Sequence, residues 1–401
     1  MKVCIISRGD IFPPNHGAAA KIVNTAKYLS RLGDEVVLLT DDPKTYHVFY
    51  GGVRREEAYP AWLAKVGFDA PAIRKRLCRM GVPPEDAFLY QPMFDRNFWA
   101  RAAWAARRHR FRVIQAEFPG YVMPAYVAKN ALVPRRPMVV LVEHNVEFLR
   151  IPQSSQVDRR AERNLRRIEK AMIALCNRVV AVSPVDQASL VSAGVPRRKV
   201  AVIPHGVDLE NYRGLDGAGV RERLGVPAAA FVIVYHGVLH YGPNRDAALW
   251  LAQEILPELL RRGRDVWLLL VGMNAPAECT AGPAAGRVVT TGAVPNLPAH
   301  LAAADAAVVP LRGGGGTRMK ILEYFAAGLP VVSTPKGAEG IPATPGRDLV
   351  LASTAGAIAD AVCRMMDDHA HARALGEAAR RFVERYDWLE ICRQYQELYG
   401  K

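Results

Sequence analysis

The chain has 401 residues, a formal net charge of +14 and six cysteines, none of them in a C-x-x-C pair. This length allows two domains of ordinary size, and a composition that is half hydrophobic and 23% charged is typical of globular proteins. The scattered cysteines argue against a zinc knuckle or a disulfide framework, and no apolar run approaches the ~18 residues of a membrane-spanning helix. Residues 1–10 become polar too soon for a signal peptide, so we expect a cytoplasmic protein.

The excess of positive charge favours an anionic partner. Lys and Arg number 53, against 39 Asp and Glu, which suits nucleotides, phospholipid headgroups or nucleic acid. No zinc-finger or RNA-recognition signature accompanies the charge, so no nucleic-acid partner is expected. The alternative is that part of the excess positive charge reflects an arginine-rich composition and has no functional meaning.

The first elements predict the start of a doubly wound parallel sheet. Residues 3–6 form an apolar strand, residues 18–32 have helical periodicity, and residues 35–40 form a second strand. Gly17 lies in the loop before the helix, where a ligand phosphate could approach the backbone. That glycine alone is weak support, because most strand-to-helix loops contain one.

Residues 43–111 show no clear alternation of strands and helices. Within them, residues 72–80 form a basic amphipathic stretch, and residues 88–108 are rich in aromatic and arginine side chains. A long helix at 158–175 is also rich in arginine. These segments favour either contact with an anionic membrane surface, and hence a peripheral position at the inner face of the plasma membrane, or solvated faces packed on their own domain.

Two further buried strands are predicted at 112–116 and 138–142, and His144 follows the second. Parallel sheets bind ligands at the carboxyl ends of their strands, which is where this histidine falls. An isolated histidine is nevertheless more often structural.

The second half repeats the alternation of strands and helices. Residues 213–219 are rich in glycine and predict a linker, after which a strand at 231–235 ends at His236 and Gly237. We predict an α/β protein of two doubly wound, Rossmann-like domains whose strand ends face each other across a cleft that holds the ligand. The domains are residues 1–208 and residues 220–386, and residues 388–399 form a terminal amphipathic helix.

The stretch from Val308 to Thr334 has the most informative pattern in the chain. An apolar strand is followed by four glycines, by Thr317 as a candidate N-cap and by a helix that ends at Gly328. Glycine N–H groups and a helix N-terminus attract anions, and Arg318 and Lys320 add two positive charges in the first turn.

Cations at that end of a helix oppose the helix dipole unless an anion is near, so the pattern favours a phosphate site. Glu323, one turn further on, could accept hydrogen bonds from ribose or sugar hydroxyls. The alternative is a flexible loop, a solvated basic turn and an exposed glutamate.

These residues resemble the retaining glycosyltransferases of family 4, which have the GT-B fold, from one end of the chain to the other. The matching pieces, in order, are P-P-N-H-G, E-H-N, V-V-A-V-S, V-I-P-H-G-V-D, Y-H-G-V-L-H-Y-G-P-N, A-D-A-A-V-V-P-L and G-G-G-T-R-M-K-I-L-E-Y-F-A-A-G-L-P-V-V-S-T. The last block is specific, and the others are individually weak. The closing Y-D-W-L-E-I-C-R-Q-Y resembles the family's terminal helix, which implies that a crossing helix at 387–401 returns to the domain of residues 1–208. The G-x-L-x-Y-x-P-N block resembles the branch that makes bacterial surface polysaccharides.

The resemblance implies roles for the helix that follows the glycine run. Glu323 would hold the donor's ribose, Lys320 and Arg318 would face its diphosphate, and Gly316 and Thr317 would offer it backbone N–H groups.

It also implies roles elsewhere in the chain. Gly17 would close on the donor, His144 would lie near the reacting carbon of the sugar, and Val294 would grip the base. Gly237 and Gly315 are the remaining donor-binding positions. Gly315 replaces a glutamate that usually reads the sugar's hydroxyls, which leaves sugar recognition open.

The family's usual Arg and Lys after the first strand of the second domain are also missing, since Leu239 and Gly242 occupy that neighbourhood. We expect Arg318 and Lys320 to supply the missing charge.

The activity implied by the resemblance is transfer of a sugar, with retention, from a nucleoside diphosphate sugar to a glycan or lipid-linked acceptor. No D-x-D motif is present, so neither a metal nor another cofactor is expected. The alternatives are a sugar-nucleotide epimerase of the same fold, a phosphorylase, or a non-catalytic paralogue that binds nucleotide.

Overall fold

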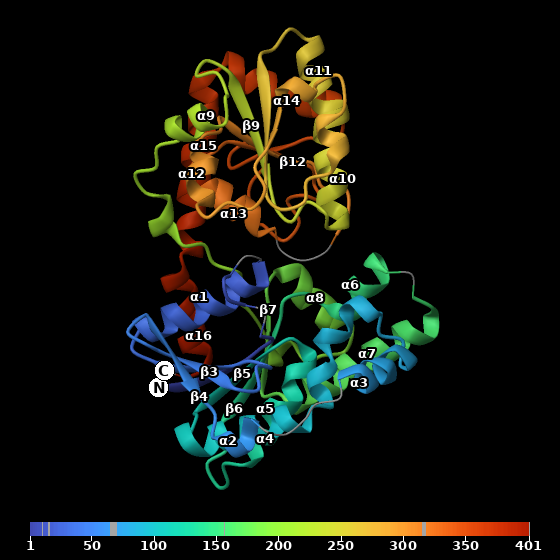
Figure 1. The fold of residues 1–401 in the computed structure, drawn as a ribbon, viewed down its shortest axis with the longest axis vertical. Coiled ribbons are helices and arrows are strands. Elements are labelled where there is room, and N and C mark those ends of the chain that lie inside the picture. The colour runs from blue at the N-terminus through green and yellow to red at the C-terminus, as the bar shows by residue number, and fades with distance from the viewer. Residues whose placement is uncertain (10, 15–16, 65–69, 156, 315–317, 401) are drawn as a thin grey trace. The chain divides into compact units, whose positions relative to one another are not determined.

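The computed structural model describes residues 1–9, 11–14, 17–64, 70–155, 157–314 and 318–400. They form two compact units, Met1–His205 with Trp388–Lys401, and Gly206–Asp387, which are traced in Figure 1. The boundary falls between His205 and Gly206, so the expected linker at 213–219 lies inside the second unit and does not connect the two.

The described part of the first unit contains an eight-stranded sheet in the order β4-β3-β2-β1-β5-β6-β7-β8. The strands are β1 (Lys2–Ile6), β2 (Glu35–Leu39), β3 (Thr45–Tyr50), β4 (Val53–Ala58), β5 (Val113–Glu117), β6 (Met138–Glu143), β7 (Arg178–Ala181) and β8 (Val200–Val202). The strands from β2 to β8 in this order are parallel, as predicted, whereas β3 and β4 form an antiparallel hairpin at one edge. The expectation of a purely parallel first sheet was therefore wrong.

The hairpin turns at Gly51 and Gly52, which have φ angles of 55° and 83°. Two consecutive residues with positive φ match the right-handed twist of the flanking strands and make a tight two-residue connection. The hairpin lies in the stretch that gave no clear sequence pattern.

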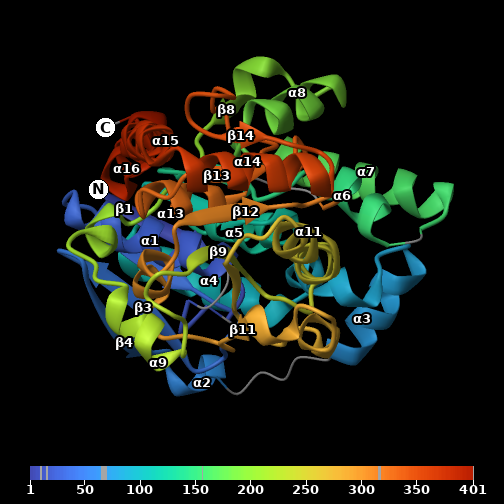
Figure 2. The same cartoon turned by 90° about the horizontal axis from the view of Figure 1, so that it is seen from above.

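The helices of the first unit cover both faces of its sheet. They are α1 (Gly17–Arg31), α2 (Ala61–Ala64), α3 (Ala70–Arg79), α4 (Arg96–His109), α5 (Val122–Asn130), α6 (Glu147–Ser154), α7 (Arg159–Leu175), α8 (Pro184–Ser192) and α16 (Trp388–Leu398). Helix α16 packs beside α1, and Gln396 Nε2 donates to Oδ2 of Asp34 at 2.6 Å. The beginning of β1 and the end of α16 accordingly lie close together in Figures 1 and 2.

The second unit has a six-stranded parallel sheet in its described part, in the order β11-β10-β9-β12-β13-β14. The strands are β9 (Phe231–His236), β10 (Val266–Val271), β11 (Val288–Thr290), β12 (Ala306–Val309), β13 (Val331–Ser333) and β14 (Val350–Leu351). The helices are α9 (Ala218–Arg223), α10 (Gly242–Trp250), α11 (Leu256–Arg261), α12 (Leu297–Ala302), α13 (Met319–Ala326), α14 (Ala355–Asp367) and α15 (His369–Val383). A π-helical turn, Leu251–Ile255, joins α10 to α11.

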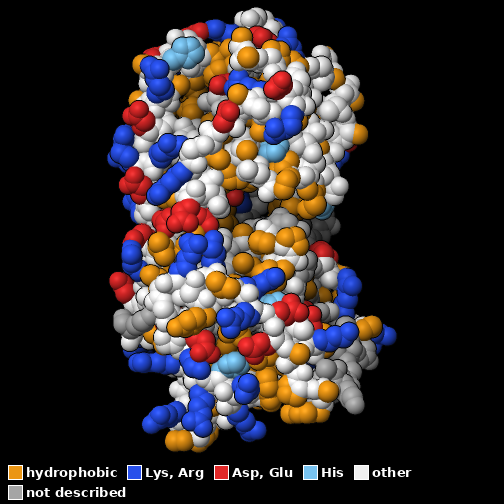
Figure 3. Space-filling view, turned by 60° about the vertical axis from the view of Figure 1, so that its left-hand side comes forward, with side chains coloured by type: hydrophobic (Ala, Val, Ile, Leu, Met, Phe, Trp, Pro, Cys, Tyr) orange, Lys and Arg blue, Asp and Glu red, His pale blue; other side chains and the backbone are white. Residues whose placement is uncertain are grey.

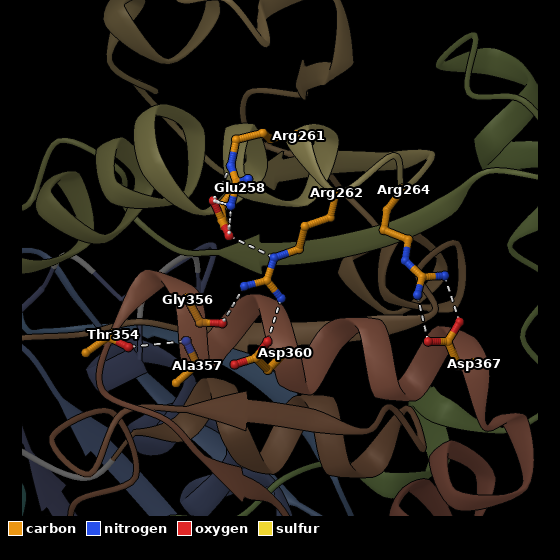
Figure 4. Close-up of polar contacts among 9 residues, drawn as sticks. All are labelled: Glu258, Arg261, Arg262, Arg264, Thr354, Gly356, Ala357, Asp360 and Asp367. Atoms are coloured by element: carbon orange, nitrogen blue, oxygen red, sulfur yellow. Dashed lines mark hydrogen bonds and ion pairs between the residues drawn. The ribbon is translucent and has the colours of Figure 1, made fainter.

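Helices α11 and α14 of the second unit are joined by ion pairs (Figure 4). Arg262 contacts Glu258 at 2.8 Å and Asp360 at 2.6 Å, and Arg264 holds both oxygens of Asp367 at 2.7 Å. Arg264 precedes β10, so this cluster lies at the edge of the sheet where that strand begins. The cluster joins two helices at the edge opposite the carboxyl ends of the strands. Because it is exposed, it adds little to stability.

Each unit has its own apolar core and its own topological switch point. In the first unit β1 lies between β2 and β5, and in the second β9 lies between β10 and β12. Connections leave such a central strand in opposite directions, which opens a crevice at the carboxyl ends of the strands where α/β sheets bind ligands. Both units therefore have the predicted doubly wound, Rossmann-like fold.

On the face drawn in Figure 3, Lys and Arg side chains are spread over both units and are interspersed with Asp and Glu. Across the residues that the structure covers, none of the helices combines the length and the apolar character needed to cross a bilayer.

Candidate functional site

Three glycines lie at neighbouring strand ends near the switch point of the second unit. Gly237 follows β9 with φ 150°, and Gly272 follows β10 with φ 137°. A Cβ on Gly272 would lie 1.8 Å from the carbonyl oxygen of Gly237, and Gly272 N donates to the carbonyl oxygen of Gly292 at 3.0 Å. Only glycine permits such close packing of backbone.

Lys320 is anchored at this edge by neutral groups. It lies in the first turn of α13, and its Nζ donates to Oδ1 of Asn244 at 2.9 Å and lies 3.9 Å from the centre of the Tyr235 ring. The Tyr235 hydroxyl donates to the same Asn244 oxygen at 2.7 Å. Burial, followed by the positive charge of Arg318, lowers the pKa of Lys320 to about 7, although Glu323 acts in the opposite direction. An anion bound nearby would therefore stabilise the charged form of Lys320.

Arg318 is the N-cap residue of α13. Its Nη2 donates to the carbonyl oxygens of Gly314 at 2.9 Å and Gly313 at 3.4 Å. Burial lowers the pKa of this guanidinium. The predicted backbone donors Gly315, Gly316 and Thr317, the last also the predicted N-cap, lie outside the described residues.

Glu323 lies on the same helix as Lys320 and faces β9. Its Oε2 is 3.2 Å from Nε2 of His236, and the carboxylate side chain is 25% exposed. His236 is itself fixed, because its backbone N donates to the Tyr324 hydroxyl at 2.9 Å and its ring meets the Tyr324 ring edge-on at 5.0 Å. A positioned, partly open carboxylate can accept hydrogen bonds from a ligand's hydroxyls.

Val294 follows β11 and lies two residues beyond Gly292. Its side chain is half-buried against the core of the second unit. The structure thus places Gly237, Lys320, Arg318 and Glu323 around one sheet edge, and Val294 in a loop that follows a strand of the same sheet.

His144 of the first unit belongs to a buried network of charged groups. Its Nε2 lies 2.7 Å from Oε2 of Glu117, and Lys21 Nζ donates to the two oxygens of Glu117 at 2.7 and 2.9 Å. Burial alone would raise the pKa of Glu117, but Lys21 and His144 outweigh it and hold the pKa at about 2. Burial also lowers the pKa of Lys21 despite this pairing. The histidine is therefore held in one orientation by a carboxylate that stays charged.

The surroundings of His144 restrict it further. Its ring stacks on Phe118 at 4.3 Å and lies 5.6 Å from the ring of His205. Phe118 has φ 80°, an unfavourable conformation for a bulky residue, and such strain concentrates at functional sites.

Gly17 is the exposed first residue of α1, one helical turn before Lys21. It therefore opens the helix that supplies the lysine of the buried network.

Sequence patterns did not identify Lys21, Glu117, Asn244 or His236 as site residues. Lys21 carried a detectable signal, because it occupies a buried position of α1 next to Ile22, where a charge needs a partner. Asn244 lay inside the G-x-L-x-Y-x-P-N block but had no role assigned.

Comparison with known proteins gives consecutive matches along the chain. A family model described as Glycosyltransferase Family 4 matches residues 16–211, and one described as Glycosyl transferases group 1 matches residues 230–368. The D-inositol 3-phosphate glycosyltransferase of Kineococcus radiotolerans is 28% identical over 257 residues, which cover 58% of this chain and 59% of that protein. The chain thus spans less than two thirds of the length of the curated relatives it matches.

Solved structures share the whole fold. Sucrose-phosphate synthase from Thermosynechococcus elongatus aligns with a TM-score of 0.73 and 20% identity, covering 100% of this chain and 98% of that one. HepE from Anabaena, in complex with UDP, aligns with a TM-score of 0.69 and 19% identity, covering 100% of both chains. The solved structures show that the chain has the GT-B fold, and the two family models that succeed each other along the sequence show that it belongs to the family 4 glycosyltransferases.

Proposed function

We propose that this protein transfers a sugar from a nucleoside diphosphate sugar to a hydroxyl group of an acceptor, with retention of the anomeric configuration. The observation that carries the proposal is Lys320, a half-buried cation held by an amide and an aromatic ring at the glycine-lined edge of the second sheet. Arg318 precedes it at the start of the same helix. The complex of the Anabaena protein HepE with UDP supports a nucleotide as the ligand.

The chemistry requires stabilisation of the departing diphosphate. In this proposal Lys320 and Arg318 meet its charge, and because they already lie in place they need little reorganisation during the reaction. Glu323, held beside His236, binds ribose hydroxyls of the donor. In this proposal the two cations stabilise the diphosphate without a metal.

His144 would act on the sugar. Glu117 and Lys21 fix its ring, so it can present one defined face to the oxocarbenium-like sugar or to a hydroxyl group of that sugar. The acceptor hydroxyl attacks from the side that the diphosphate leaves, which retains the configuration without an enzymic nucleophile.

For the acceptor we propose a glycan or a lipid-linked glycan in the synthesis of a cell-surface polysaccharide or glycolipid. The enzyme would then work in the cytoplasm, at the inner face of the plasma membrane. The resemblance of the G-x-L-x-Y-x-P-N block to the polysaccharide branch motivates this part of the proposal.

The test is a mass-spectrometric screen of UDP-, GDP-, ADP- and dTDP-sugars without an acceptor. A transferase releases nucleoside diphosphate slowly from its own donor, whereas an epimerase converts the sugar and leaves the nucleotide sugar intact. The variant Arg318→Ala/Lys320→Ala is then expected to weaken donor binding far more than it changes the acceptor's Michaelis constant. The reverse pattern, or binding of nucleotides without turnover of any sugar once acceptors are supplied, would refute the proposal.

A further inference from the structure

A groove of about 590 Å³ runs along the first unit between α1 and the β3–β4 hairpin. Phe12, Val23 and Phe49 supply its apolar floor. Its volume is within the range of small-molecule sites in proteins, which are mostly apolar and have a few polar groups placed to orient the ligand.

Contacts between distant segments hold the lining residues in place. Gly52 N donates to Oγ of Ser30 at 2.9 Å, which joins the turn of the hairpin to the last part of α1. Phe12 meets the ring of His47 edge-on at 4.6 Å, and the Arg54 guanidinium lies over the Phe12 ring at 4.1 Å. The groove is therefore a built feature of the unit.

The charges at the groove have one sign. Lys27 from α1 and Arg54 from β4 lie on opposite walls, and none of the described residues that line the groove is acidic. An apolar floor with a cation on each side complements a molecule that has a hydrocarbon part and an anionic head.

The turn of the hairpin beside the groove exposes two large side chains. Tyr50 is 71% exposed and Val53 is 63% exposed, and they flank Gly51 and Gly52. An aromatic and an aliphatic side chain at the tip of a loop, next to basic residues, are typical of proteins that anchor at a membrane interface.

From these observations we propose that the groove binds a phosphate-bearing lipid. Its hydrocarbon part lies against Phe12, Val23 and Phe49, its phosphate lies between Lys27 and Arg54, and the hairpin tip enters the headgroup layer. The inference extends the proposed function, for which it supplies the lipid part of the acceptor. It differs from the hypothesis that the basic stretch at residues 72–80 contacts the membrane.

The first experiment measures binding of monomeric octyl phosphate to the full chain by calorimetry, with inorganic phosphate as the second ligand. We expect octyl phosphate to bind the wild type and to bind Lys27→Gln/Arg54→Gln about 30-fold more weakly, since each basic residue near a lipid phosphate contributes about fivefold in affinity. Arg55→Gln is the matched control, because neighbouring side chains on β4 point to opposite faces. Equal affinity of the double variant and the wild type, or equal binding of inorganic phosphate, would overturn the proposal.

The second experiment measures sedimentation with vesicles of phosphatidylcholine alone and of phosphatidylcholine mixed with phosphatidylglycerol. The wild type and Arg74→Gln/Lys75→Gln should sediment with the mixed vesicles, and Lys27→Gln/Arg54→Gln should not. Loss of sedimentation in the Arg74/Lys75 variant alone would assign membrane contact to α3 and refute the groove. Neither experiment contains a nucleotide sugar, so the failure of this inference is distinguishable from failure of the proposed function.

Discussion

Lys320 and Asn244 are joined by a hydrogen bond of 2.9 Å between a lysine ammonium and an amide oxygen. The pKa of this lysine lies at about 7, against an ordinary value of 10.5. An amide offers the ammonium much less stabilisation than a carboxylate would, so the charge state of Lys320 responds to any anion that binds beside it.

The first prediction concerns the pH dependence of nucleotide binding. A bound diphosphate raises the pKa of Lys320, so binding of UDP, or of whichever nucleotide the screen identifies, should take up protons near pH 7 to 8. The affinity should fall by up to about tenfold per pH unit above the free-state pKa. Calorimetry in two buffers of different ionisation enthalpy measures the uptake, and Lys320→Met should remove it. An affinity independent of pH from 7 to 9 would contradict the assigned role.

The same lysine affects stability with a definite sign. Its folded-state pKa of about 7 lies below the unfolded value of 10.5, so the unfolded chain binds more protons in that window. The contribution of Lys320 to the free energy of unfolding therefore increases as pH rises from about 7 to 10.5, and stays at its unfavourable limit below about 7. The difference in urea unfolding between the wild type and Lys320→Met across this range measures the contribution of Lys320 to the free energy of unfolding.

A second prediction concerns Asn244, which also receives the hydrogen bond of Tyr235. Asn244→Ala should raise the donor's Michaelis constant by roughly tenfold to a hundredfold, because hydrogen bonds to charged groups contribute roughly 1.5–3 kcal/mol. Asn244→Asp should place a carboxylate beside Lys320, raise its pKa and compete with the diphosphate. If Asn244→Asp bound the donor better than the wild type, the proposal that Lys320 pairs with the diphosphate of the donor would be wrong.

The third prediction compares two buried glutamates that end neighbouring strands. Glu117 on β5 pairs with Lys21, whereas Glu143 on β6 has side-chain oxygens without a hydrogen-bond partner in the described part of the chain. Glu117→Gln should destabilise the first unit by about 3–5 kcal/mol, because it leaves a buried lysine unpaired. Glu143→Gln should change stability by about 1 kcal/mol or less, since burial raises the pKa of Glu143 well above its ordinary value.

Urea unfolding measures both glutamate variants, and Glu117→Gln/Lys21→Met should recover most of the loss. The pH dependence has opposite signs for the two acids. Stability from Glu117 is present above its unfolded pKa and is lost as pH falls towards about 2, whereas that from protonated Glu143 is lost as pH rises through its elevated pKa. Equal costs for the two single variants would show that the charge network adds nothing specific.

The fourth prediction concerns the glycines of the second sheet. Gly272→Ala should lower the free energy of unfolding by at least about 3 kcal/mol, because its Cβ would overlap the carbonyl oxygen of Gly237 and its φ is positive. Gly242→Ala is the control, since nothing lies within 4 Å of the added Cβ. Thermal unfolding should show a lower midpoint for Gly272→Ala and little change for Gly242→Ala.

Local sequence patterns predicted the doubly wound sheets and the helix that carries Lys320 and Glu323, because those features depend on spacing along a short segment. The site in the structure contains contacts that the sequence did not predict, and these contacts join residues far apart in the sequence. Lys21 and Glu117 are 96 residues apart, and Lys320 and Asn244 are 76 apart. No periodicity encodes such a pair, and only the topology of the sheet brings its members together.

The β3–β4 hairpin was missed for a different reason. Strand β4 reads V-R-R-E-E-A and is exposed at most positions, because it is the edge strand and has no apolar face to alternate with a polar one. Its identity as a strand follows from the tight turn and from pairing with β3, whose residues other than Thr45 are apolar or aromatic. Strand recognition from alternation fails wherever one strand is not half-buried.

Helix α16 has a consequence for how this protein is made. Its Gln396 binds Asp34, and Tyr399 donates to Gln115, which in turn donates to Glu117. The first unit therefore requires a segment that leaves the ribosome only after the whole second unit has been translated. Until then the nascent first unit exposes the side of α1 that α16 covers, and a stalled or truncated product would be a target for chaperones and proteases.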